Sequence, residues 1–141
     1  MNPPLSRSDA QSYNALQLAY IGDCVYSLLI RLFALREGKG VKSMHQRTTG
    51  MVNAAAQAKA LECIFGTLEE DEKDIVRRGR NAHSRHQAPK SASTAQYSAS
   101  TGFEALIGYH YLTGQTDRIN ELLGLILNYA MNEQILSLEQ P

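Results

Sequence analysis

The feature that most constrains the fold is one long apolar segment near the start of the chain. From Ala15 to Leu35 the apolar residues run nearly all round a helix instead of along one stripe. This pattern is typical of a buried central helix, because an amphipathic surface helix keeps one polar face. Asp23 and Arg31 interrupt the run, and the residues before it contain no apolar signal core. We therefore expect a cytoplasmic protein without membrane association, built around this helix.

The other segments also predict helices. Alanine is frequent between Met51 and Phe65, and glycines stand where several helical patterns end. Thr67 and Glu70 have the spacing of a capping box. No segment shows the alternation of a strand, so the expected fold class is all-α, a helical bundle. The predicted helices cover residues 15–35, 41–47, 51–65, 68–79, 102–112 and 116–138.

Length and composition set the domain organisation. A chain of 141 residues with 43% hydrophobic content can build one ordinary core and has no room for a second folded module. Residues 1–8 contain two prolines and few apolar residues, which predicts a flexible leader before a single domain over residues 9–141. Cys24 and Cys63 lie in apolar helical patterns, so we expect reduced thiols in the core.

Two isolated carboxylates are the candidate functional residues. Asp23 is the only acid between Ala15 and Leu35, and Glu104 is the only acidic or basic residue, histidine aside, in the apolar segment 102–112. Burying an unpaired carboxylate is expensive. Each of the two must therefore be paired, protonated, exposed or bound to a cation.

Glycines accompany both acids. Gly22 directly precedes Asp23, and Gly108 lies one helical turn after Glu104. Glycine inside a helix costs about 1 kcal/mol relative to alanine, so its presence favours close helix approach or space for a ligand. Two helices crossing here would bring the two carboxylates together. Mg²⁺ suits such a sparse site, because it takes one or two carboxylates plus water and phosphate oxygens, and this chemistry indicates phosphodiester hydrolysis.

Each carboxylate also has a structural alternative. Asp23 could pair with Arg31, two turns further along the same helix, or with a base elsewhere in the fold. Thr101 and Glu104 have the spacing of a second capping box. The residue pattern alone leaves these alternatives open.

The net charge of zero conceals a local excess of basic residues in one segment. No acid occurs between Asp74 and Glu104, and residues 80–98 have the composition of a long loop. An acid-free basic loop that leads into the helix of Glu104 predicts contact with RNA phosphates. The alternative is a solvated loop whose arginines satisfy the acidic start of the preceding helix. The predicted RNA-binding residues are Arg77, Arg78, Arg80, Arg85 and Lys90.

Two segments resemble the ribonuclease III family. Residues 18–26 (LAYIGDCVY) are similar to its signature segment, in which an apolar pair and a glycine precede a catalytic aspartate. Residues 101–112 (TGFEALIGYHYL) are similar to its later helix, in which a glutamate followed by Ala-Leu-Ile-Gly is a metal ligand. Two such motifs in this order are more specific than either alone. Residues 52–58 and 78–82 further resemble the Mini-ribonuclease III branch, which lacks a separate double-stranded-RNA-binding domain.

The resemblance extends over residues 15–130 and carries functional implications. It implies a ribonuclease III endonuclease-like domain in which Asp23 and Glu104 are the catalytic residues and hold Mg²⁺, with Mn²⁺ as a substitute. A metal-activated water would cut double-stranded RNA and leave a 5′-phosphate and a 3′-hydroxyl. It also implies a homodimer in which each subunit cuts one strand, and maturation of a large-subunit (23S) ribosomal RNA precursor, with a large-subunit ribosomal protein as a partner.

The chain departs from the larger enzymes of that family at two positions. Ala19 and Thr101 stand where those enzymes carry a glutamate and an aspartate, so four carboxylates become two. This leaves open whether one or two metals act. The loss of two carboxylates also keeps open an alternative, in which the chain is a catalytically inactive, ribosome-associated RNA-binding protein on the same fold. Retention of Asp23 and Glu104 favours the enzyme. A helical module for protein–protein interaction would leave the basic segment unexplained.

Overall fold

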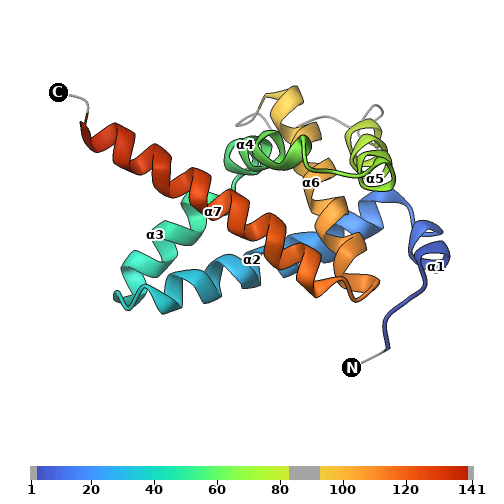
Figure 1. Ribbon diagram of the computed structural model, residues 1–141, viewed down its shortest axis with the longest axis horizontal. Helices are drawn as coiled ribbons and strands as arrows, with labels where there is room; N and C mark the ends of the chain where they lie inside the picture. Colours follow the sequence, from blue (N-terminus) through green and yellow to red (C-terminus); the bar gives the residue numbers. More distant parts are fainter. Residues whose placement is uncertain (1–2, 83–92, 140–141) are drawn as a thin grey trace.

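The computed structural model describes residues 3–82 and 93–139, and within them the chain is helical with no strand. The all-α prediction is therefore confirmed. The helices, labelled in Figure 1, are α1 (Arg7–Gln11), α2 (Ala15–Arg36), α3 (Val41–Val52), α4 (Ala54–Phe65), α5 (Glu70–Asn81), α6 (Thr94–Leu112) and α7 (Thr116–Glu139).

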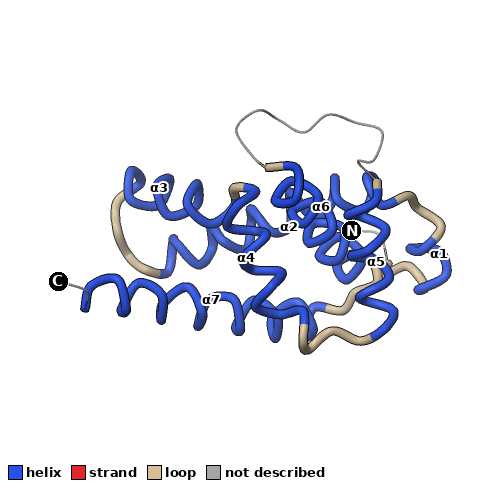
Figure 2. Tube along the Cα trace, turned by 90° about the horizontal axis from the view of Figure 1, so that it is seen from above, coloured by secondary structure: helices blue, strands red, loops and turns tan. Residues whose placement is uncertain are grey.

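Helix α6 is the element around which the others pack. It contacts α1, α2, α4, α5 and α7, and α7 lies diagonally across one side of the bundle (Figures 1 and 2). The main core lies between α2, α4, α6 and α7, where the rings of Tyr26 and Phe103 meet edge to face with centroids 4.8 Å apart. Between Ser100 and His110, every residue of α6 except Glu104 is buried.

Helix α2 is capped at its start by Asn14 and Gln17. The Asn14 side chain accepts the backbone N–H of Gln17 (2.8 Å), and the Gln17 side chain accepts that of Asn14 (3.0 Å). Of the described helices, α2 alone is long and apolar enough to cross a bilayer, judged by length and composition. One side of it packs against α6 and α3 instead. The other side stays exposed and includes Cys24, so the expectation that this thiol is buried in the core was wrong.

Caps also explain two boundaries that the sequence patterns misplace. The Asn53 side chain accepts the backbone N–H of Ala56 (2.8 Å), so a new helix begins there and the predicted helix 51–65 is divided. Helix α6 begins at Thr94 rather than Gly102, because the Ser93 hydroxyl caps it. Its first turns are polar and therefore carry no apolar signal.

Two predicted features of α5 are corrected as well. The capping box is formed by Glu69 and Glu72, whereas the Thr67 hydroxyl donates to the carbonyl of Ile64 (2.7 Å). Gly79 does not end the helix. It lies inside α5 against α6, where an added Cβ would stand 2.6 Å from the Cα of Gly102.

The segment before α1 contacts the end of α6 from Pro4 onward. The backbone N–H of Leu5 donates to the carbonyl of Leu112 (2.8 Å), and the Pro4 ring lies beside Gly114. Ser6 then caps α1, which begins two residues before the expected start of the domain. These contacts fix the start of the chain against the end of α6.

A buried carboxylate that the sequence patterns do not indicate joins α5, α6 and α7. Glu72 is 3% exposed and bonds to His110 Nε2 (2.7 Å) and to the Arg118 guanidinium (2.9 and 3.0 Å). Burial alone would raise the pKa of Glu72, but the hydrogen bonds from Arg118, the Glu69 backbone and His110 outweigh it and lower the pKa. Glu72 is thus a charged tie between three helices.

Candidate active site

Helices α2 and α6 touch through their backbones where they cross. A Cβ added to Gly22 would overlap the carbonyl oxygen of Glu104, and one added to Gly108 would overlap the carbonyl oxygen of Leu18. Only glycine allows such an approach, so these two residues set the distance and the register of the crossing. The predicted close approach is confirmed. Because Asp23 follows Gly22 and Glu104 lies one turn before Gly108, the crossing carries both acids to one place.

The two carboxylates meet at this crossing. Asp23 is exposed and Glu104 is half-buried, and their side chains are within hydrogen-bonding contact. Burial, and then the hydrogen bond and charge of Asp23, raise the pKa of Glu104 to about 8, against the opposing hydrogen bond from Ser100. Glu104 therefore keeps a proton at neutral pH in the absence of a cation.

Within residues 3–82 and 93–139, neither structural alternative for these acids is present. Arg31, the candidate partner of the first acid, donates from Nε to the Ser27 hydroxyl (3.4 Å). Thr101 lies well inside α6, and its hydroxyl donates to the carbonyl of Tyr97 (3.1 Å) instead of capping the helix. Neither acid therefore has a basic partner in the part of the chain that the structure describes.

The pair fits a hard divalent cation. Carboxylate oxygens are the ligands that Mg²⁺ prefers, and one or two of them suffice when water and substrate phosphates complete the coordination. Like charges this close keep a proton between them until a cation replaces it. Among the described residues no cluster of three or more acidic, histidine or cysteine side chains could hold a metal. Asp23 and Glu104 are therefore the candidate ligands.

A second layer behind Glu104 consists of Ser100 and Gln57. Ser100 lies one turn earlier on α6, and its hydroxyl bonds to the Gln57 side chain from α4 and stands 3.4 Å from Glu104 Oε1. Gln57 lies in the segment 52–58 that resembles the Mini-ribonuclease III branch, but neither residue is among the predicted site residues. The available signals were the four-residue spacing of Ser100 from Glu104 and a glutamine in an alanine-rich segment.

Two of the predicted RNA-binding arginines have protein partners. Arg77 forms an ion pair with Asp74. Arg78 donates to the carbonyls of Gln11 (3.3 Å) and Tyr13 (2.8 Å), and so ties α5 to the segment between α1 and α2. Their contact with RNA stays a prediction.

The remaining bases of that set are differently placed. Arg80 is exposed, and its guanidinium lies 5.9 Å from the centre of the Phe65 ring. Arg85 and Lys90 fall outside the described residues. Helix α5 contacts α6 at Gly102. Gly102 and Glu104 lie on different faces of α6, because two residues along an α-helix correspond to a rotation of about 200°. The structure therefore does not bring Arg80 together with the carboxylate pair.

The carboxylate pair makes a prediction about stability. In Glu104→Gln without metal, we expect a melting temperature above that of the wild type, with an advantage that grows from pH 5 to pH 8.5. The folded wild type binds a proton at Glu104 that the unfolded chain releases near its usual pKa, so wild-type stability falls as pH rises through about 8. Thermal melts in EDTA test this, with Glu62→Gln on α4 as the control. An advantage independent of pH would contradict it.

Comparison with known proteins identifies the family. Residues 16–115 match the Ribonuclease III domain. The chain is 50% identical to a Mini-ribonuclease 3 from Symbiobacterium thermophilum over 109 residues. This aligned segment covers 77% of this chain and 83% of the relative. The chain is also 43% identical over 122 residues to one from a Thermoanaerobacter species, covering 86% and 85%. The fold matches a crystal structure of a Fusobacterium nucleatum protein with a TM-score of 0.77 at 29% identity, covering 83% of this chain and 95% of that one. This chain belongs to the ribonuclease III family and, within it, to the Mini-ribonuclease III branch.

Proposed function

We propose that this ribonuclease III-type endoribonuclease hydrolyses double-stranded RNA with a divalent cation, Mg²⁺ or Mn²⁺, held by Asp23 and Glu104. The observation that carries the proposal is the contact between these two carboxylates at the α2–α6 crossing. A structural pair of acids would be expected to have a basic partner, as Glu72 has in Arg118. Asp23 and Glu104 have no ion pair among the described residues.

Asp23 and Glu104 are expected to contribute in different ways. Asp23 is exposed and can reach substrate, whereas half-buried Glu104 is held by α6, the most enclosed helix. A bound cation would neutralise charge on the scissile phosphate and lower the pKa of a coordinated water. Glu104 must release its proton for the cation to bind, so we expect cation binding to weaken below about pH 8. The proposed products carry a 5′-phosphate and a 3′-hydroxyl.

Cleavage of a labelled long duplex RNA tests this function. With Mg²⁺ we expect fragments bearing 5′-phosphates, and none with EDTA. Asp23→Asn and Glu104→Gln should each lower the rate by at least about a hundredfold, because each removes a ligand of the cation that stabilises transition-state charge. Both variants should still bind RNA and melt cooperatively. Bound but uncut RNA with the wild type would favour an RNA-binding protein without catalysis.

We assign the phosphate contacts to the basic segment that leads into α6. Arg85 and Lys90 belong to this segment and precede Ser93, the residue that caps α6, in the sequence. Neutralising phosphates with such side chains adds affinity without reading sequence. Shape would then dominate recognition, as is usual for duplex RNA.

Salt dependence of RNA binding tests this assignment. In a Glu104→Gln background, which binds without cutting, we expect Arg85→Ala with Lys90→Ala to weaken duplex binding. The slope of log affinity against log salt should fall by about 1 to 2, since each phosphate contact contributes close to one. Arg36→Ala, at the exposed end of α2, is the control. An unchanged slope in the double variant would remove these residues from the interface.

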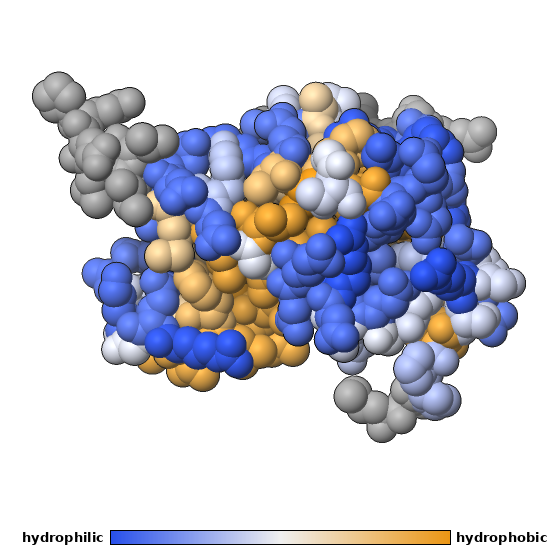
Figure 3. Space-filling view, viewed as in Figure 1, coloured by the Kyte–Doolittle hydropathy of each residue, from blue (hydrophilic) through white to orange (hydrophobic). Residues whose placement is uncertain are grey.

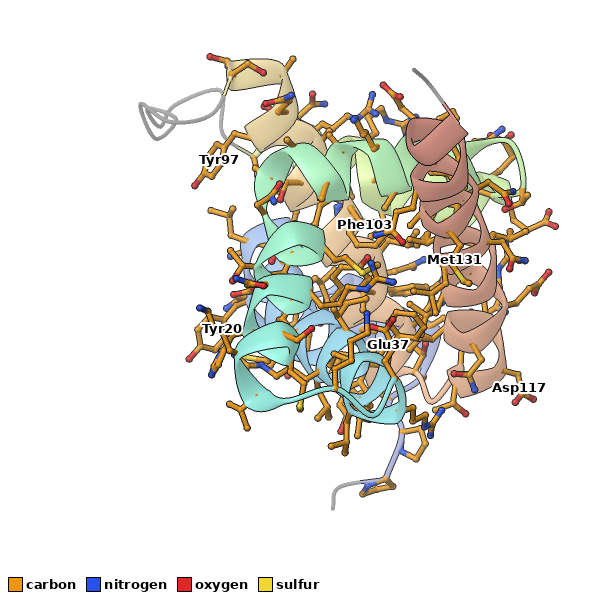
Figure 4. All side chains as sticks on the ribbon, turned by 90° about the vertical axis from the view of Figure 1, so that its left-hand side faces the viewer. Tyr20, Glu37, Tyr97, Phe103, Asp117 and Met131 are labelled. Carbon is orange, nitrogen blue, oxygen red and sulfur yellow. The ribbon has the colours of Figure 1, made fainter. Side chains whose placement is uncertain are left out.

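We propose that a second copy of the chain covers the exposed side of α2. Large apolar side chains of α2, among them Leu16, Tyr20 and Leu28, remain exposed. Figure 3 shows a separate group of apolar residues below α7 on the near face, whereas Tyr20 lies on the side away from α7 in Figure 4. Tyr20 is 76% exposed and points away from the molecule in Figure 4, beside a pocket that Leu16, Ile21 and Leu112 help to line. A protruding side chain next to an apolar pocket on one face is what a two-fold interface needs, because the same patch must fit itself.

Sedimentation analysis tests the homodimer. We expect the wild type to sediment as a dimer and Tyr20→Arg as a monomer with an unchanged circular dichroism spectrum, because the substitution places two like charges in an apolar interface. Val41→Arg, also highly exposed but at the start of α3, should remain a dimer. A monomeric wild type, or a dimeric Tyr20→Arg, would contradict the proposal.

The biological substrate we propose is a precursor of large-subunit (23S) ribosomal RNA in the cytoplasm, presented with help from a large-subunit ribosomal protein. The support is the similarity of the chain to Mini-ribonuclease 3 proteins over most of its length. Mapping the 5′ ends of that RNA in cells lacking the protein would reveal unprocessed ends if the proposal is right.

A further inference from the structure

Gln57 and Ser100 form a buried polar pair that no step described so far uses. Gln57 is 1% exposed and Ser100 is 6% exposed. Both lie between α4 and α6, where apolar side chains would pack without needing hydrogen-bond partners. Burying polar groups is unfavourable unless they are hydrogen-bonded. Packing alone therefore does not explain why polar residues occupy these two positions.

The Ser100 hydroxyl stands between two side chains that each present an oxygen. It bonds to Oε1 of Gln57 and lies 3.4 Å from Oε1 of Glu104, yet it has one proton to donate. Turning the Gln57 amide over exchanges its oxygen and nitrogen with almost no change of shape. The amide then donates to Ser100, and Ser100 donates to Glu104. This arrangement gives the chain of hydrogen bonds one direction, from Gln57 through Ser100 to Glu104.

We propose that Gln57 and Ser100 are positioning residues, which hold one oxygen of Glu104 so that its carboxylate stays turned toward Asp23. The inference rests on the proposed function, since it treats Glu104 as a cation ligand. A glutamate side chain has several rotamers, and fixing one before binding reduces the entropy that binding must remove. Hydrogen-bond partners of metal ligands commonly change metal affinity or activity by about 10- to 100-fold when removed.

The test measures cation binding as well as cleavage. Ser100→Ala and Gln57→Leu should need about tenfold more Ca²⁺ or Mg²⁺ to reach half of the cation-induced rise in melting temperature. Their kcat should fall by a similar factor while KM for RNA stays unchanged, because both residues are buried. Ser100→Thr keeps the hydroxyl and should restore both values. Without cation, the melting temperature of Ser100→Ala should differ from that of the wild type by only a few degrees. Ser100→Ala therefore tests the proposal even if Gln57→Leu does not fold.

Thr113→Val is the matched control, because its half-buried hydroxyl lies on the residue after α6, at the far end from Glu104, where it donates to backbone carbonyls and accepts from the Gln115 side chain. If Ser100→Ala has the cation affinity and kcat of Thr113→Val, the positioning role is wrong although the enzyme works. If the wild type is neither stabilised by cations nor able to cut duplex RNA, the proposed function fails and the positioning role fails with it.

Discussion

The backbone contact between α2 and α6 is the interaction on which the rest of the structure depends. It needs glycine at both Gly22 and Gly108, because a methyl group at either would overlap a main-chain carbonyl of the opposite helix. The contact fixes how α6 lies against α2, and α4, α5 and α7 then pack around α6. The same contact places Asp23 beside Glu104. Architecture and chemistry therefore share one constraint, and neither glycine can change without affecting both.

Glu72 and Glu104 are both removed from solvent, at least in part, and their surroundings have opposite effects. Glu72 is more deeply buried, yet Arg118, a backbone N–H and His110 stabilise its charge and lower its pKa. Glu104 faces another acid, and its pKa is raised to about 8. The first arrangement ties three helices together. The second holds a proton that a cation can replace, which is expected of a binding site and not of a structural pair.

Much of this could be predicted from sequence because the informative signals are local. The apolar run of α2, the glycines beside Asp23 and Glu104, and the family motifs all lie in short segments. The misplaced features depend on contacts between distant segments. Asn53 divides a helical pattern only because it caps α4, and the first turns of α6 are polar and give no periodic signal. Gln57 meets Ser100 across two helices, a pairing that no spacing along the chain reveals.

The distance along the chain between the two acids has a consequence for folding. Asp23 and Glu104 are about 80 residues apart, and contacts between such distant segments form only after a large entropic cost of loop closure has been met. Neither helix carries a catalytic centre by itself. With the proposed site at Asp23 and Glu104, a nascent or partly folded chain has no nuclease site until α6 has docked onto α2.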